Sequence, residues 1–268
     1  MIKTVQSDGR SIDQYIPRDL RRMFYQNTVP DYKYRRADGY DPYGFLTDGL
    51  VLYLPLWALK GASFKSVDAY QHACSVTGAL WQPNGRYFGG EADNIDVGSA
   101  ASLECPSFTF ACWVKRYEAG VHHTLIADTY TSTAVKDHYI NLRFTDTNVI
   151  GLYFGDGTNA GDASSTGKVA DTNWHFIAVS RNDDTEKIQF VIDSTAETAV
   201  NYGTSCGTLI TLGTQTLKLG IASVSSYARP LKGYMGEAWL YNKPSFDGDL
   251  TVNSRAAHLR SMTSWRYQ

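Results

Sequence analysis

The sequence predicts an all-β protein, in which two antiparallel sheets pack as a sandwich and an extended arm precedes them. Short segments with strand character follow one another from residue 49 onward, separated by turn residues and without intervening helices. Tyrosine (18 residues) and glycine (23 residues) are plentiful, which suits half-buried pleated surfaces and tight turns. Residues 1–48 show no periodic apolar pattern. We therefore expect these residues to form the N-terminal arm and residues 49–268 to form the sandwich.

The first expected strand spans residues 50–57, where four leucines alternate with Val, Tyr, Pro and Trp. Both faces of this strand are apolar, so it should be buried on both sides. Asn84-Gly85 is a type I′ turn signal ahead of a strand at 86–88. Further strands are expected at 108–114, 139–144, 149–154, 174–179, 188–192 and 217–220, and one late helix at 249–260. The side chains expected to be largely buried are Phe110, Cys112, Trp113, Phe176, Ile177, Phe190 and Trp239.

Composition limits the partners and the compartment. The formal net charge is −2, which argues against a nucleic-acid partner because phosphate binding needs a basic face. The first residues lack an apolar segment of signal-peptide type, and the longest apolar run is too short to span a bilayer. We therefore expect no signal peptide and no membrane partner. The four cysteines show no metal-ligand spacing and are expected to be free thiols in a protein made in a cytoplasm.

Four segments, in this order along the chain, resemble the laminin G-like and concanavalin A-like lectin superfamily. They are Tyr87–Val97, Phe108–Lys115, Asp171–Val179 with Phe190–Asp193, and Leu219-Gly220 with Lys232–Asn242. The resemblance covers about residues 49–260 and implies a jelly-roll sandwich whose members mostly bind glycans or proteins through loops at one rim. One position departs from the family pattern: Ser194 follows Asp193 where the family has glycine. The hairpin turn there is expected to be altered.

The same scaffold also occurs in glucanases, so the resemblance makes glycan hydrolysis a second function to test against the residues. Such enzymes place carboxylates at alternating positions of one strand, so that nucleophile and acid share a face about 5 Å apart. Glu91, Asp93 and Asp96 superficially follow that spacing, but Gly89-Gly90 lies beside them. We expect a turn at Asp93, a solvent-facing strand residue at Asp96 and no catalytic residue.

Sugar binding would need an exposed aromatic face beside amide or carboxylate groups at a loop rim. The candidate ligand-binding residues on this basis are Tyr130, Asp156, Asn159 and Tyr227. No cofactor is expected, although calcium remains open because loop carboxylates suit this cation. The candidate calcium donors are Asp128, Asp156 and Asp162, with plain turns as the alternative.

Histidines form a second group of possible site residues. His122-His123, with Asp128 and His138, fits no common zinc spacing and is expected to lie in a solvated loop. Trp174-His175 is expected to be a structural strand start, because the resemblance places it there.

The arm concentrates tyrosine and arginine, the residue types enriched at protein interfaces. One short helix is expected within it, around residues 16–25. We expect the arm to dock on neighbouring subunits, with a disordered solvated tail as the alternative. The residues assigned to docking are Arg18, Arg21, Arg22, Phe24, Tyr32, Tyr34, Arg35 and Arg36.

Three classes of function are consistent with this sequence. The first, which we expect, is a non-enzymatic structural and binding protein of a phage or virus particle, either a capsid decoration or a tail or fibre component. It would be made in the host cytoplasm, reside in the virion as a homo-oligomer and display a carbohydrate-binding sandwich toward cell-surface glycans. The second is a free carbohydrate-binding lectin module. The third is a glycoside hydrolase of the concanavalin A-like class.

Overall fold

A computed structural model of the 268-residue chain confirms the all-β sandwich. It describes residues 48–128, 139–202, 206, 212–213, 215–222, 229–244, 259–260 and 263–267. Residues 1–47 of the docking arm, Tyr130, His138, Tyr227 and most of the expected late helix lie outside these described residues. Within them, no helix has the length and apolar character that crossing a membrane requires.

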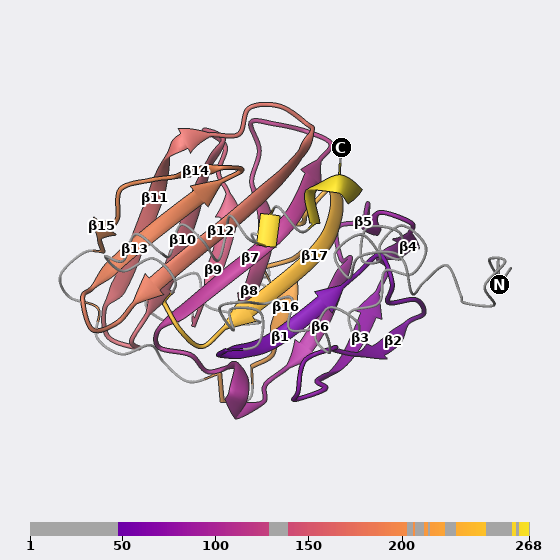
Figure 1. Ribbon diagram of the computed structural model, residues 1–268, viewed down its shortest axis with the longest axis horizontal. Coiled ribbons are helices and arrows are strands. Elements are labelled where there is room, and N and C mark those ends of the chain that lie inside the picture. The colour runs from indigo at the N-terminus through magenta and orange to yellow at the C-terminus, as the bar shows by residue number, and fades with distance from the viewer. Residues whose placement is uncertain are drawn as a thin grey trace, which may run out of the picture. The chain divides into compact units, whose positions relative to one another are not determined.

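Two antiparallel sheets form the sandwich (Figure 1). In the nine-stranded sheet the order is β14-β13-β12-β7-β17-β5-β4, with β1 paired to β17 and β15 paired to β13. Its strands are β1 (Leu50–Pro55), β4 (Leu80–Gln82), β5 (Gly85–Phe88), β7 (Phe108–Arg116), β12 (Trp174–Asn182), β13 (Lys187–Ile192), β14 (Thr195–Ala196), β15 (Val200–Asn201) and β17 (Gly233–Tyr241).

The eight-stranded sheet has the order β11-β10-β9-β8-β16-β6-β3-β2. Its strands are β2 (Ser63–Lys65), β3 (Ala73–Thr77), β6 (Asn94–Gly98), β8 (His123–Asp128), β9 (Asn141–Phe144), β10 (Val149–Gly155), β11 (Ala160–Lys168) and β16 (Leu217–Leu219). In the described part of the chain, two short 3₁₀ helices, η2 (Ala101–Leu103) and η4 (Ser264–Arg266), accompany the strands.

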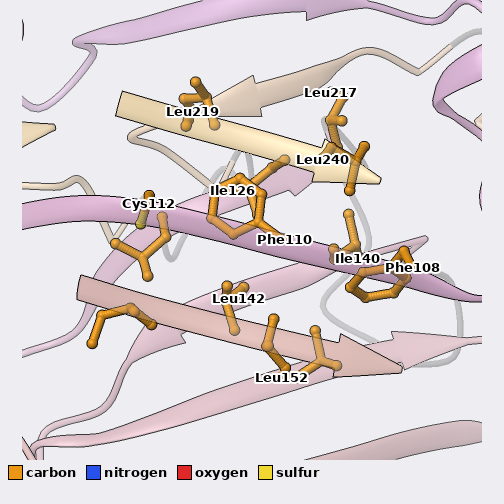
Figure 2. Packing of buried hydrophobic residues seen from close by; sticks show 14 of the residues in the cluster. Phe108, Phe110, Cys112, Ile126, Ile140, Leu142, Leu152, Leu217, Leu219 and Leu240 are labelled. Carbon is orange, nitrogen blue, oxygen red and sulfur yellow. The ribbon is translucent and has the colours of Figure 1, made fainter. Parts of the chain in front are cut away.

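The main apolar core lies between the two sheets. Phe110 and Cys112 of β7 belong to one buried cluster with Ile126, Leu142 and Leu152 of the other sheet (Figure 2). Full burial of one such aliphatic or aromatic side chain stabilises the fold by about 1.5–3 kcal/mol.

The four cysteines are free thiols, as the sequence predicts, and all four are buried. Burial raises the pKa of Cys74 and of Cys105 to about 12, so both thiols stay protonated.

A second apolar layer covers part of the outer face of the nine-stranded sheet. Trp113 and Phe176 are paired residues on β7 and β12, one position away from the core pair Cys112 and Ile177, and therefore point outward. The Trp113 ring stacks on Tyr267 at a centroid distance of 4.8 Å, which places the C-terminal segment over it. The seven side chains predicted to be buried are all at most 4% exposed, so that prediction is confirmed.

The first strand is buried on both faces, as predicted, because it contacts both layers. Leu52 and Leu54 belong to the core between the sheets. Tyr53 points the other way, stacks on Trp239 at 5.5 Å and donates a hydrogen bond to the buried Glu237 carboxylate at 3.0 Å.

Two local predictions are wrong. The hairpin between β4 and β5 turns at Pro83 and Asn84, and Gly85 already pairs with Gln82, so Asn84-Gly85 is not the turn pair. Gly85 is required for a different reason: its φ is +141°, and a Cβ atom there would lie 2.2 Å from the Met235 carbonyl oxygen.

The second error concerns the expected solvated loop at His122-His123 and Asp128. His123 begins β8 and Asp128 ends it, and both are 1% exposed. The ring nitrogens of His123 each lie 3.0 Å from a backbone carbonyl oxygen, those of Pro230 and Glu118. This histidine joins two chain segments inside the fold.

Candidate functional site

One row of side chains crosses the outer face of the nine-stranded sheet. Leu80 pairs with Tyr87, Tyr87 with Tyr234, Tyr234 with Lys115, and Lys115 with Trp174. Directly paired residues point to the same side of a sheet, so these five side chains lie next to one another. Figure 1 shows β12, β7 and β17 running side by side at this part of the sheet.

Four aromatic residues form a continuous surface here, which we call the aromatic row: Tyr87, Tyr117, Trp174 and Tyr234. Ring centroids of Tyr87 and Tyr234 are 5.3 Å apart, those of Tyr87 and Tyr117 5.5 Å, and those of Tyr117 and Tyr234 5.7 Å. Trp174 lies 6.1 Å from Tyr234. Tyr117 is 51% exposed and the other three are half-buried, so the row is open to a ligand.

Neighbouring residues hold the rings in place. A Cβ atom on Gly89 would lie 2.5 Å from the Tyr87 hydroxyl oxygen, so the absence of a side chain at this position makes room for the tyrosine. At the other end of the row, Tyr267 packs on Trp174 at 4.7 Å. The row is therefore largely pre-organised, which limits the entropy that binding would cost.

Polar groups accompany the apolar ring faces. The Tyr117 hydroxyl donates to the Tyr234 hydroxyl oxygen at 3.0 Å. This hydrogen bond, with some burial, raises the pKa of Tyr117 to about 12, so its hydroxyl stays protonated at neutral pH. Lys115 contributes an ammonium group within the row, and Lys232 pairs with Glu91 at 2.7 Å close by. Flat ring faces beside hydroxyl and ammonium donors are suited to a saccharide, which has apolar C–H faces and many hydroxyls.

The sequence-based candidates Asp156 and Asn159 lie together in the loop between β10 and β11, but they bond to each other. Asp156 accepts hydrogen bonds from the backbone N–H groups of Thr158 at 2.8 Å and Asn159 at 2.6 Å. The Asn159 amide donates to the second Asp156 oxygen at 3.3 Å. These contacts stabilise the turn. Tyr130 and Tyr227, the aromatic partners proposed for them, lie outside the described residues.

The three candidate calcium donors are not brought together. Asp162 is exposed on β11, and β10 and β9 separate it from β8, which carries Asp128. Three strand spacings amount to about 14 Å. Over the described part of the chain, no group of three or more His, Cys, Asp or Glu side chains is arranged to hold a metal ion.

The three carboxylates with glucanase-like spacing each have a structural contact. Glu91 is exposed and pairs with Lys232. Asp93 accepts the backbone N–H groups of Gly89 and Gly90, both at 2.8 Å, as expected for a turn residue. Asp96 lies on β6 and accepts a hydrogen bond from the Thr216 hydroxyl at 2.9 Å.

His175 lies between two aspartates at the start of β12. Its Nε2 atom is 2.8 Å from Asp171 and its Nδ1 atom 2.9 Å from Asp193. Asp193 also accepts the backbone N–H of Phe176 at 3.0 Å and adopts a positive φ of +55° in the hairpin turn with Ser194. Asp tolerates this conformation, so the two-residue turn forms although serine replaces the family's glycine. These contacts link the loop before β12 to the β13–β14 turn. His175 therefore has a structural role at the start of the strand, as the sequence predicts.

Sequence reasoning missed the aromatic row because its members are far apart in the chain. A signal was nevertheless present. In Tyr87-Phe88 and Tyr234-Met235 the second residue belongs to the core, so the tyrosine before it must face outward.

The chain belongs to the concanavalin A-like lectin/glucanase superfamily, because the Laminin_G_3 model of that superfamily matches residues 88–248. This finding bears out the resemblance. No curated protein sequence matches the chain.

Solved structures show the same sandwich at low sequence identity. The CBM40 module of a Ruminococcus gnavus IT-sialidase, bound to α2,3 sialyllactose, is 12% identical with a TM-score of 0.50, over 74% of this chain and 95% of that one. Domain 4 of AbnA, a GH43 extracellular arabinanase from Geobacillus stearothermophilus in complex with arabinotriose, is 13% identical with a TM-score of 0.57, over 78% and 97%. A Trypanosoma rangeli sialidase is 15% identical with a TM-score of 0.55, and 81% of this chain corresponds to 33% of that enzyme. At these identities the likeness establishes the fold.

Proposed function

We propose that the sandwich binds a glycan through the aromatic row. The observation that carries this proposal is the set of four adjacent, partly exposed rings with a hydrogen-bonded pair of tyrosine hydroxyls among them. A sugar would stack its apolar face on the exposed Tyr117 ring and bond its hydroxyls to those of Tyr117 and Tyr234. The sialyllactose and arabinotriose complexes of similar sandwiches support the proposal.

A glycan array carrying arabinotriose, lactose and 3′-sialyllactose tests this function. We expect the wild-type protein to bind at least one class of glycan and Tyr117→Ala to lose most of that binding. Tyr70→Ala is the matched control, because Tyr70 is 53% exposed but stacks on His72 away from the row. Equal loss in both variants, or no glycan bound by the wild type, would reject the proposal.

Catalysis is not part of the proposed function. Glu91 forms an ion pair, and Asp93 stabilises a turn. Of the three carboxylates, only Asp96 lies within a strand, where it makes a structural contact. Glu91→Gln and Asp93→Asn should leave glycan binding unchanged. Hydrolysis of a bound glycan that disappears in either variant would show an enzyme instead.

A second, more specific proposal is that residues 1–48 attach this sandwich to a phage or virus particle. Its support is the arm's composition, with interleaved tyrosine and arginine and no apolar periodicity. A free lectin module is the alternative. Electron microscopy of the native source material separates the two: a repeating lattice that contains this chain supports a particle, and a dispersed protein supports the lectin.

A further inference from the structure

The outer face of the eight-stranded sheet carries a group of polar side chains that the aromatic row does not use. Thr124 pairs with Arg143, and Asn141 pairs with Tyr153. Their chain neighbours Leu125, Leu142 and Leu152 belong to the core, so these four side chains point to the opposite side of the sheet.

Arg143 and Tyr153 form the centre of this surface. The Arg143 guanidinium carbon lies 3.9 Å from the centroid of the Tyr153 ring. A Cβ atom on Gly151 would lie 2.7 Å from that ring, so the tyrosine occupies the space above the glycine and lies across its own strand. Both side chains are half-buried, which holds them in place and leaves them reachable.

A second arginine and a histidine lie beside them. The backbone N–H of Thr124 donates to the Arg229 carbonyl oxygen at 3.0 Å, so Arg229 runs along the end of β8. Burial, followed by the charge of Arg229, lowers the pKa of Arg143. Burial lowers the pKa of His122 most, and the charges of Arg229 and Arg143 lower it further. Asp146, which is exposed, is the acidic group that acts on both His122 and Arg143.

Several polar atoms in this group are buried and lack a hydrogen-bond partner. They include the Asn141 Oδ1 atom on a side chain 3% exposed, and the Thr124 hydroxyl on a residue with no exposure. The Nδ1 atom of His122 and the Nε atom of Arg143 are also buried and lack a hydrogen-bond partner. Buried polar groups are nearly always bonded, so unsatisfied ones gathered at one place indicate a ligand or ordered water.

We propose that this group, which we call the arginine cluster (Thr124, His122, Arg143, Tyr153, Asn141 and Arg229), binds the carboxylate of an acidic saccharide. The planar guanidinium fork matches a carboxylate in two parallel hydrogen bonds, which an ammonium cannot do. The unpartnered oxygens of Thr124 and Asn141 would bond to ring hydroxyls. The cluster is on the opposite sheet from the aromatic row, so the proposal is independent of the function proposed above.

Calorimetric titration with D-glucuronate, and with D-glucose as the neutral counterpart, tests the proposal. We expect D-glucuronate to bind and D-glucose not to bind measurably. Arg143→Gln should weaken glucuronate binding at least tenfold, and Arg143→Lys should weaken it nearly as much because it keeps the charge but loses the fork. Lys187→Gln, which removes one exposed charge from β13, should leave it within about twofold.

Two further measurements make the result independent of variant folding. In isotope-labelled wild-type protein the side-chain amide signals of Asn141 should shift with D-glucuronate and not with D-glucose. Sodium sulfate should compete only weakly, because it offers no ring hydroxyls. Equal binding of both sugars, unchanged Asn141 signals, unchanged affinity in a folded Arg143→Gln variant, or sulfate binding as tight as glucuronate would each overturn the proposal.

Discussion

At the scale of single residues, Trp113 is buried outside the main core. Its ring packs between Phe176 and Tyr267, and its indole N–H donates to the Thr263 hydroxyl oxygen at 2.6 Å. Trp113→Ala should therefore lower the free energy of unfolding by about 3–5 kcal/mol, as for other buried aromatic truncations. Denaturant unfolding measures this loss. A loss below about 1 kcal/mol would show that the covering segment contributes little to the burial of Trp113.

His175 makes stability depend on pH in a defined direction. Burial acts to lower its pKa, but hydrogen bonds to Asp193 and Asp171 outweigh burial, so the folded pKa lies above the ordinary value of 6.5. The stability that protonated His175 contributes is complete below about pH 6.5 and is lost as the pH rises through the raised pKa. Hydrogen bonds from the Asn173 backbone and His175 lower the pKa of Asp171 below 3.8, so its contribution is lost only as the pH falls through that lowered value.

The test compares the wild type with His175→Gln over a range from about pH 5 to about pH 9. The wild-type advantage in unfolding free energy should be largest near the acidic end and shrink as the histidine loses its proton. An advantage that is constant across the range, or that grows with pH, would contradict the assignment.

Residue burial could be predicted from sequence, but the place of burial could not. Alternation shows that Trp113 and Cys112 point to opposite faces, and both are apolar enough to be inside. Nothing in that pattern tells which face meets the other sheet and which is covered by residues far away in the chain, such as Tyr267.

At the scale of elements, the C-terminal segment at 263–267 covers the outer face of β17. A Cβ atom on Gly236 would lie 2.3 Å from the Tyr267 ring, so Gly236→Ala should displace that ring and cost about 1–3 kcal/mol. In a double-mutant cycle, the cost should largely disappear when Tyr267→Ala is already present. Additive costs measured by thermal unfolding would show that the two residues do not meet.

Strands rich in aromatic and β-branched residues, such as β7 and β12, could be predicted, whereas β8 and β11 could not. The sequence of β11 is AGDASSTGK, which has little strand propensity. Its buried positions are small: a Cβ atom on Gly161 would lie 2.3 Å from the Phe154 ring, so packing against β10 selects glycine there. In β8 the pairing register shifts between Thr124 and Ile126, which breaks the alternation that marks a strand.

At the scale of the whole molecule, the sandwich should fold without the arm. The described strands build a complete core from residue 50 onward. Deleting residues 1–46 should leave a soluble protein with an unchanged β-type circular dichroism spectrum that no longer joins the proposed particle. Unfolding would mean that the arm completes the sandwich core, and normal assembly would remove the proposed anchoring role.

The candidate sites were less accessible from sequence than the fold. The residues of the aromatic row come from strands β5, β12 and β17 and from the end of β7, and only the sheet order brings them together. The loop pair Asp156 and Asn159 had suitable chemistry, but its polar atoms bond within the turn. Residue type alone therefore predicted candidate binding residues in loops. The strand register instead gathers aromatic and polar side chains on the faces of the sheets.

The most direct test of glycan binding at the aromatic row is a titration of isotope-labelled protein with arabinotriose and with 3′-sialyllactose, followed through the tryptophan indole N–H signals. Trp174 is half-buried in the row, and Trp113 is an internal control because its indole already bonds to Thr263. We expect a saturating shift of the Trp174 signal with at least one glycan, while the Trp113 signal stays in place. An unchanged Trp174 signal while a glycan binds, or no shift with either glycan, would rule out glycan binding at the aromatic row.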